Sequence, residues 1–238
     1  MAPPLPSEAG AVYHGFMRAE EIHARLHNYS RAEELANCFT HGLGVLLSIF
    51  GGVALIGLAA GQNDQNRFFA ACVYGIAVVV FYSLSTAYHS VRKPYARYIF
   101  RILDHIAIYI MIAGSYTPFA LVTLRGLVGK VLFGTVWGLG AVGAILKIFT
   151  VHRMRVAGPI IYLGMGWLAL VVLKPLMAAM PATALLFFFL GGAAYTIGVI
   201  FYLWDRLPFN HAIWHLFVLT GSACHFWAIF HYVTPLHL

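Results

Sequence analysis

The sequence predicts an all-α integral membrane protein, a seven-transmembrane-helix bundle with its N-terminus inside and its C-terminus outside. Of the 238 residues, 61% are hydrophobic and only 10% are charged, whereas soluble domains carry about 25% charged residues. Apolar stretches of about 20 residues, enough to cross roughly 30 Å of hydrocarbon, recur along almost the whole chain after residue 37. These observations exclude an ordinary soluble domain.

Residues 1–37 are predicted to form a cytoplasmic N-terminal tail, because they contain no apolar run that resembles a signal peptide. Ser30 and Glu33 have the spacing of a capping box, which suggests a short interfacial helix that leads into the first span. A solvated tail without structure is the alternative. Since all later loops are short, residues 38–238 are expected to form one transmembrane domain.

Seven apolar segments follow the tail. The fifth is the least regular, because Lys174 and Pro175 interrupt it. In the third, the run 114–118 (GSYTP) predicts a kinked, closely packed stretch whose freed carbonyls are met by hydroxyls. The predicted spans are Cys38 to Ala60, Phe68 to His89, Ile99 to Val122, Leu127 to Phe149, Pro159 to Met180, Ala182 to Trp204 and His211 to Val233.

The basic residues predict the orientation, since lysine and arginine near helix ends are retained on the cytoplasmic side. With the N-terminus inside, only Arg67, Arg125, Lys130 and Lys174 of the fifteen basic residues lie outside. The net charge of +7 therefore reports topology and contact with anionic lipid heads, and no nucleic-acid partner is expected. The expected location is the inner membrane of the cell.

Ionisable residues converge at the cytoplasmic boundary of this topology. His89 ends the second span, Asp104 opens the third, and His211 and His215 open the seventh. At a spacing of four residues, His211 and His215 project from one helix face within about 6 Å of each other. Ser85 precedes His89 by one turn and shares its face.

Three imidazoles and a carboxylate at one depth are the parts of a catalytic zinc site: three ligands, an open position and a base. The alternative is that these histidines are only interfacial residues whose rings meet water. The spacing predicts that His225 and His231 lie too deep to join the site and that His105 points away from it.

The same residues resemble a signature shared by the hemolysin III proteins, by the progestin and adipoQ receptors, which include the adiponectin receptors, and more distantly by the alkaline ceramidases. The short tail and short loops resemble the bacterial hemolysin III branch most closely. The matching motifs are Ser85-x-x-x-His89, Asp104-His105, His211-x-x-x-His215, Glu34-x-x-Asn37-x-x-Thr40-His41 and Gly114-Ser115-Tyr116-Thr117-Pro118. The resemblance implies a seven-helix bundle with its N-terminus inside and a Zn²⁺ ion held by His89, His211 and His215. It also implies that Asp104 holds the zinc-bound water, with Ser85 beside the site.

The function expected from these residues is zinc-dependent hydrolysis of an acyl bond in a membrane lipid, with a ceramide-type amide as the first candidate. Asp104 is the expected base, and Ser85 is an expected donor to the developing oxyanion. One alternative is a receptor or regulator of lipid homeostasis in which zinc is structural. A cytolytic pore is less favoured, because no ring of charged residues repeats along a span. The sequence leaves the lipid and the oligomeric state open.

Four polar residues of the first span, Glu34, Asn37, Thr40 and His41, follow one stripe of a helix that enters at the same membrane face. A role beside the metal is one interpretation. Helix packing and capping is the favoured one, because nothing in the sequence gives these residues a chemical task.

Overall fold

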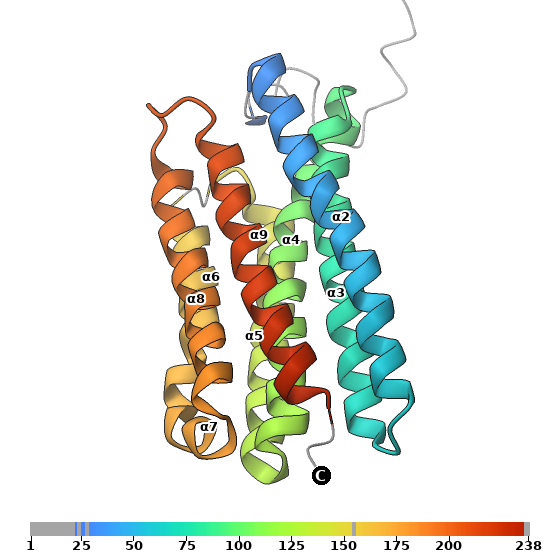
Figure 1. Ribbon diagram of the computed structural model, residues 1–238. Helices are drawn as coiled ribbons and strands as arrows, with labels where there is room; N and C mark the ends of the chain where they lie inside the picture. Colours follow the sequence, from blue (N-terminus) through green and yellow to red (C-terminus); the bar gives the residue numbers. More distant parts are fainter. Residues whose placement is uncertain (1–21, 23–24, 27–28, 154–155, 236–238) are drawn as a thin grey trace, which may run out of the picture.

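The computed structural model describes residues 22, 25–26, 29–153 and 156–235, which form a helical bundle without strands (Figure 1). Seven helices in this part of the chain are long and apolar enough to cross a membrane, which confirms the predicted fold class. The spans are α2 (Arg31–Ala60), α3 (Gln65–Ser90), α4 with η2 (Pro94–Leu124), α5 (Gly126–Thr150), α6 to α7 (Ala157–Ala179), α8 (Ala182–Leu203) and α9 with η4 (Asn210–Val233).

The predicted capping box is present and begins the first span itself. The Ser30 hydroxyl accepts a hydrogen bond from the Glu33 amide (3.2 Å), and the Glu33 carboxylate accepts one from the Ser30 amide (2.9 Å). Since α2 is continuous from Arg31 to Ala60, this box does not begin a separate interfacial helix. Most of the residues that precede α2 lie outside the described part of the chain. The interfacial helix in the tail therefore stays a prediction.

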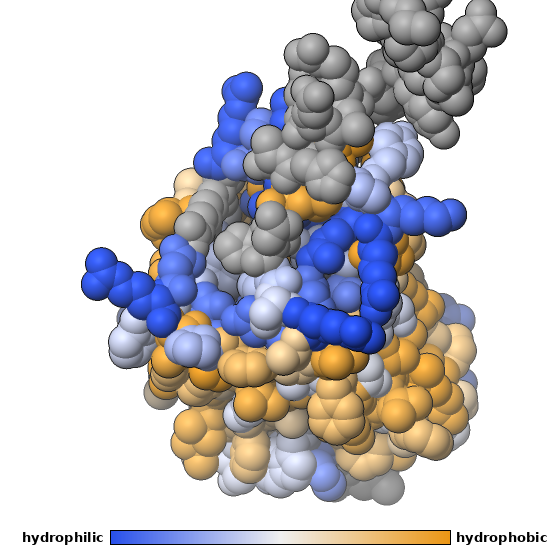
Figure 2. All heavy atoms as spheres, turned by 90° about the horizontal axis from the view of Figure 1, so that it is seen from above, coloured by the Kyte–Doolittle hydropathy of each residue, from blue (hydrophilic) through white to orange (hydrophobic). Residues whose placement is uncertain are grey.

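The bundle has one polar end and apolar flanks. Figure 1 shows the start of α2 at the upper end and the end of α9 at the lower end. Seen from above, hydrophilic side chains gather at the upper end while the flanks are hydrophobic (Figure 2). Large apolar side chains such as Phe50, Leu127 and Val171 are exposed on the surface of the bundle. Lipid tails would cover such a surface, as the predicted class requires.

The predicted close packing in the third span is present. A Cβ atom on Gly114 would lie 2.5 Å from the Cβ of Ala77 in α3, so only glycine fits at this contact. The Thr117 hydroxyl donates to the Ala113 carbonyl (2.9 Å), and beyond Pro118 the helix widens into the π-helical segment η2 (Phe119–Leu124). This widening is the local irregularity that the GSYTP run predicts.

The fifth span is broken earlier than its sequence suggests. The interruption begins at Trp167, one turn or more before Lys174 and Pro175. The hydroxyl of Tyr116 in α4 accepts a hydrogen bond from the Ala169 amide (2.9 Å) and donates one to the Gly166 carbonyl. It thereby satisfies backbone groups that the break leaves free inside the membrane. The three pieces are α6 (Ala157–Gly166), the 3₁₀ helix η3 (Trp167–Val172) and α7 (Leu173–Ala179).

At the opposite end from the start of α2, an ionic cluster ties α3 to the end of α9. Asp64 caps α3 and pairs with Arg67 (3.0 Å) and Arg125 (2.8 Å). Burial raises the pKa of the Asp64 carboxyl, but the hydrogen bonds and charges of the two arginines outweigh burial and leave the pKa below its ordinary value. Arg67 also donates to the carbonyls of residues 233–235.

Candidate metal centre

The structure brings together the three histidines that the sequence predicts as ligands. His89 lies in the last turn of α3, and His211 and His215 lie in the first two turns of α9. All three side chains are buried, and one ligand nitrogen from each lies within 4.8 Å of the other two. Such a group has the size and composition of a three-histidine metal site.

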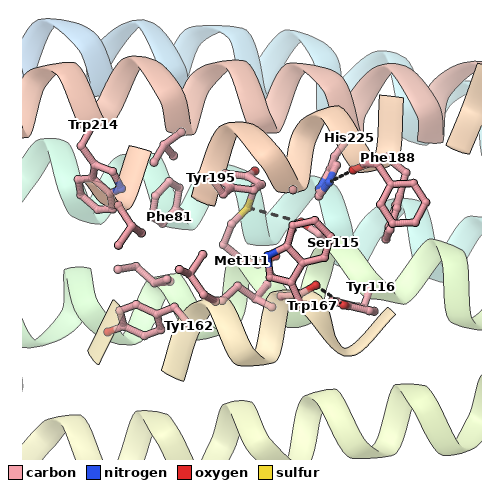
Figure 3. A pocket seen from close by; sticks show the side chains of 18 residues that line it. Phe81, Met111, Ser115, Tyr116, Tyr162, Trp167, Phe188, Tyr195, Trp214 and His225 are labelled. Atoms are coloured by element: carbon pink, nitrogen blue, oxygen red, sulfur yellow. Dashed lines mark hydrogen bonds between the residues drawn. The ribbon is translucent and has the colours of Figure 1, made fainter. Parts of the chain in front are cut away.

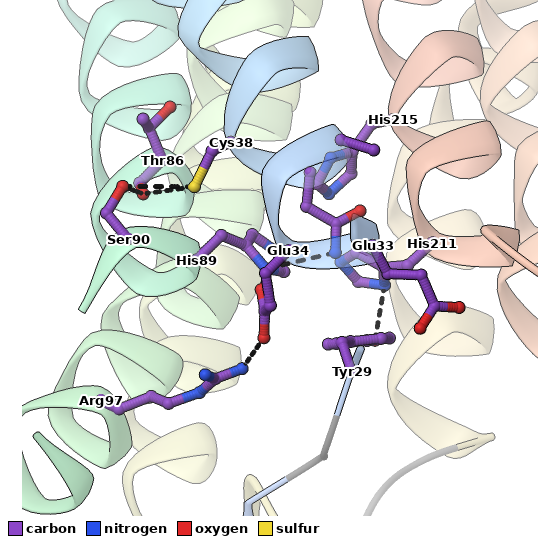
Figure 4. Close-up of polar contacts among 12 residues, drawn as sticks. Tyr29, Glu33, Glu34, Cys38, Thr86, His89, Ser90, Arg97, His211 and His215 are labelled. Carbon is purple, nitrogen blue, oxygen red and sulfur yellow. Dashed lines mark hydrogen bonds and ion pairs between the residues drawn. The ribbon is translucent and has the colours of Figure 1, made fainter. Parts of the chain in front are cut away.

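Each of these histidines has its Nδ1 atom engaged by a polar partner from α2 or from the residues just before it. Figure 4 shows Glu34 beside His89 and Tyr29 beside His211. The partners are Glu34 Oε2 for His89 (2.7 Å), the Tyr29 hydroxyl for His211 (3.0 Å) and Thr40 Oγ1 for His215 (3.1 Å). Metal-bound histidines characteristically donate their second ring N–H in this way, which fixes the tautomer and the direction of the ring.

The Nε2 atoms of His89 and His215 are buried and have no hydrogen-bond partner within the described structure. A buried polar atom without a partner costs roughly 1–3 kcal/mol, so these two atoms are unfavourable in the absence of a ligand. A cation that accepts imidazole nitrogen, such as zinc, matches this donor set. The residues present therefore fit the metal that the sequence suggests.

Two residues of the polar stripe on α2 contact the three histidines directly, which supports the interpretation that they have a role beside the metal. The Glu34 carboxylate contacts His89 and forms an ion pair with Arg97 of α4. The Thr40 hydroxyl donates to the Ala36 carbonyl (2.9 Å), which leaves its oxygen free to accept the Nδ1 proton of His215.

The other two residues of the stripe are fully buried beside the ligands. The side-chain nitrogen of Asn37 lies 3.4 Å from His89 Nδ1. The ring of His41 stacks on that of His215, with centroids 3.5 Å apart, and neither of its nitrogens has a hydrogen-bond partner among the described residues. His41 therefore packs against a ligand without belonging to the three-histidine group.

Tyr29 is a site residue that sequence reasoning missed. Its ring centroid lies 5.1 Å from that of His211 and 5.9 Å from that of His89. Burial raises the pKa of the Tyr29 phenol well above its ordinary value, with further contributions from neighbouring groups, so the hydroxyl stays protonated. The one signal for Tyr29 was its position immediately before the capping box.

The predicted base, Asp104, is buried in α4 and interacts with the Ser85 hydroxyl and with His89. The structure thus places both predicted catalytic residues next to a predicted ligand. His105 donates instead to the Arg101 carbonyl (2.8 Å), and His225 hydrogen-bonds the Phe188 carbonyl (3.1 Å). Neither belongs to the three-histidine group, in agreement with the spacing argument.

One cavity lies beside the histidines, and a second adjoins it. The first, here called the polar pocket, has a volume of about 130 Å³, and its lining includes Tyr29, Arg101, Asp104, Lys147, His152 and His211. The second, the apolar pocket, has a volume of about 120 Å³, and its lining includes Phe81, Met111, Trp167, Phe188 and Tyr195 (Figure 3). Ile108, Tyr162, Val199 and Trp214 line both. A polar compartment next to the metal ligands therefore adjoins a lipophilic one.

The comparison with known families matches this arrangement over nearly the whole described chain. A family model described as haemolysin-III related matches residues 29–226, a range that includes Tyr29, all three histidines and Asp104. The chain belongs to the haemolysin-III family. Hemolysin III membership confirms the resemblance seen in the sequence motifs.

Relatives in bacteria and animals support the same family. The chain is 46% identical to Hemolysin-3 of Bacillus cereus over 85% of this chain and 93% of the relative. It is 44% identical to the Hemolysin-3 homolog of Bacillus subtilis (strain 168) over 84% and 94%, respectively. It is 32% identical to the human monocyte to macrophage differentiation factor over 84% of each chain. Each of these three matches thus covers most of both proteins that are compared.

Proposed function

We propose that this haemolysin-III protein is a zinc-dependent hydrolase that cleaves an acyl bond in a membrane lipid, with a ceramide-type amide as the first candidate. The observation that carries the proposal is the group of three buried histidines whose ligand nitrogens lie within 4.8 Å of one another, next to a buried carboxylate and a pocket. A purely interfacial role for the histidines does not require their second nitrogens to be fixed by three separate partners.

The residues divide the chemistry among them. A zinc ion held by the three histidines would supply a Lewis acid that polarises a carbonyl and acidifies water. Asp104 accepts the proton from water and holds it on its carboxylate. Ser85, whose hydroxyl interacts with Asp104, positions that carboxylate, and it reaches a developing oxyanion only if the hydroxyl turns away from Asp104.

The apolar pocket supports a lipid as the substrate. It adjoins the polar pocket through four shared residues and is lined mainly by aromatic and aliphatic side chains. An acyl chain in the apolar pocket would place the polar end of the lipid beside His211 and Asp104. The charge asymmetry of the sequence supports placing this end of the bundle at the cytoplasmic face of the membrane.

The first test is elemental analysis of the detergent-purified protein. We expect about one zinc ion per chain in the wild type and in His225→Ala, and loss of zinc in His211→Ala and in His215→Ala, because two imidazoles hold zinc far more weakly than three. His225 is the matched control, since it is a half-buried histidine of the same helix outside the three-histidine group. A folded wild type that takes up no added zinc would remove the hydrolase mechanism.

The second test separates the hydrolase from a receptor or regulator with structural zinc. Asp104→Asn should keep the metal and lose turnover of lipid amides and esters, since an amide cannot accept the proton. Unchanged turnover in this variant would show that Asp104 is not the base. Zinc in the wild type without turnover of any lipid amide or ester would favour the receptor.

A further inference from the structure

Part of the wall of the polar pocket is basic. Lys147 of α5, Arg101 of α4 and His152, just after α5, all line it. Arg101 is close enough to interact electrostatically with both Lys147 and His152. The proposed hydrolysis of an acyl bond gives these residues no task.

Lys147 is the most unusual member of this group. Its side chain is only 1% exposed, and no hydrogen bond or ion pair joins its ammonium to any described residue. It lies over the ring of Tyr162, with Nζ 5.6 Å from the centroid. A Cβ atom on Gly158 would come within 2.8 Å of Nζ, so this glycine leaves room for the ammonium. A buried cation without an anion is costly, and in a membrane helix it commonly marks a functional site.

The other two donors are also left without an anion. The Arg101 guanidinium donates to the Arg25 carbonyl, and no carboxylate pairs with it in the described part of the chain. His152 Nε2 accepts a hydrogen bond from Arg153 (3.1 Å), so in the neutral ring the proton lies on Nδ1, which is buried without a partner among the described residues. Burial and the nearby arginines lower the pKa of His152, as expected in a region of positive potential.

The acidic residues of the pocket do not neutralise this wall. Asp104 interacts with Ser85 and His89 on the metal side and attracts Arg101 without forming an ion pair with it in the described structure. Asp205 also lines the pocket and has an interaction of its own. An anion that enters the pocket would therefore meet an ammonium, a guanidinium and an imidazole N–H that are available to bind it.

We propose that Lys147, Arg101 and His152 bind the phosphate of a phosphorylated amphiphile whose acyl chain occupies the adjoining apolar pocket. Three donor groups match the three terminal oxygens of a phosphate monoester better than the two oxygens of a carboxylate. Binding of this amphiphile requires only the pocket and does not depend on the proposed hydrolase activity. The further reading that this amphiphile is the substrate class rests on the proposed hydrolase function.

The test is a binding assay on the full-length protein in neutral detergent with radiolabelled 1-oleoylglycerol 3-phosphate. Unlabelled 1-oleoylglycerol, oleate and inorganic phosphate serve as competitors. We expect the wild type to prefer the phosphorylated lipid over 1-oleoylglycerol by about tenfold or more, as charge-assisted hydrogen bonds predict. Lys147→Met should remove most of this preference. Lys130→Met, a change of an exposed lysine on the same helix, should keep it.

Several results would overturn the inference. These are the absence of a preference in the wild type, and a preference that survives both Lys147→Met and Arg101→Gln in monodisperse samples. If Lys147→Met weakened oleate binding as much as it weakened binding of the phosphorylated lipid, the assignment of a phosphate would be overturned. If inorganic phosphate competed as well as the phosphorylated lipid, the assignment of an amphiphile would be overturned. Zinc content measured on the same samples separates the two proposals: phosphate binding without zinc would refute only the hydrolase, and zinc without the preference would refute only this inference.

Discussion

In a neutral imidazole only one ring nitrogen carries a proton, and its position decides which nitrogen can bind a metal. At His89, His211 and His215 the acceptors Glu34, the Tyr29 hydroxyl and the Thr40 hydroxyl all lie at Nδ1. They favour a proton on Nδ1 and therefore a free lone pair on Nε2. Residues outside the ligand set thus orient the ligand set.

The contact between Glu34 and His89 gives a prediction at this scale. Glu34→Gln should weaken zinc binding by about 10–100-fold, because the amide is a poorer acceptor for the Nδ1 proton than the carboxylate. Competition with a chromophoric chelator measures the affinity. Glu33→Gln removes a charge from the same turn of α2 without touching a ligand, so it should leave the affinity unchanged. Equal affinity in the wild type and Glu34→Gln would refute the assigned role of Glu34.

The sequence predicted the ligands but not their partners, and the reason is physical. The spacing of His211 and His215 on one helix marks them as candidate ligands. The predicted topology places His89 at the same depth in the membrane. Which face of α2 meets them depends on how the first and seventh spans pack, and periodicity does not contain this information. Glu34 and Thr40 were therefore interpreted as packing residues, and Tyr29 was missed.

At the scale of single elements, the break in the fifth span shows where local sequence misleads. Lys174 and Pro175 mark an interruption, but α7 begins at Leu173, so Pro175 lies in a first helical turn, where proline is tolerated. The helix actually changes at Gly166, where Tyr116 from another helix satisfies its backbone. A contact from α4 could not be read from the fifth segment alone.

Removal of the Tyr116 hydroxyl tests this contact. Tyr116→Phe should destabilise the purified protein by about 1–3 kcal/mol, because it leaves the buried Ala169 amide and the Gly166 carbonyl without their partner. Thermal unfolding in detergent gives the comparison. Tyr109→Phe is the control, since that buried tyrosine makes ring contacts but no hydroxyl hydrogen bond in the described structure. Equal loss of stability in the two variants would show that the hydroxyl is not what supports the break.

At the scale of the whole molecule, composition and length predicted the number of spans. They did not predict which spans lie next to one another. Each apolar segment predicted a helix because hydrocarbon leaves no other partner for its backbone. The structure adds that the second and seventh spans meet at the three histidines, with α2 beside both. The orientation of this bundle in the membrane rests on the charge distribution alone.

Reporter fusions test the orientation. With the N-terminus inside, alkaline phosphatase fused after Leu238 should be active and a green fluorescent protein there should be dark, because the last span would end outside. The same reporters fused after Arg153, between the fourth and fifth spans, should give the opposite result and serve as the internal control. An inverted pattern at both positions would place the metal centre at the outer face.

The α2–α9 contact at the histidines also fixes when the centre can exist. Its ligands come from the second span and from the seventh, and their partners come from the first span and the residues just before it. During synthesis the early spans enter the membrane while His211 and His215 are still unmade. A nascent chain stalled before α9 would therefore be membrane-inserted but free of bound metal, and loading becomes one of the last events in the biogenesis of the protein.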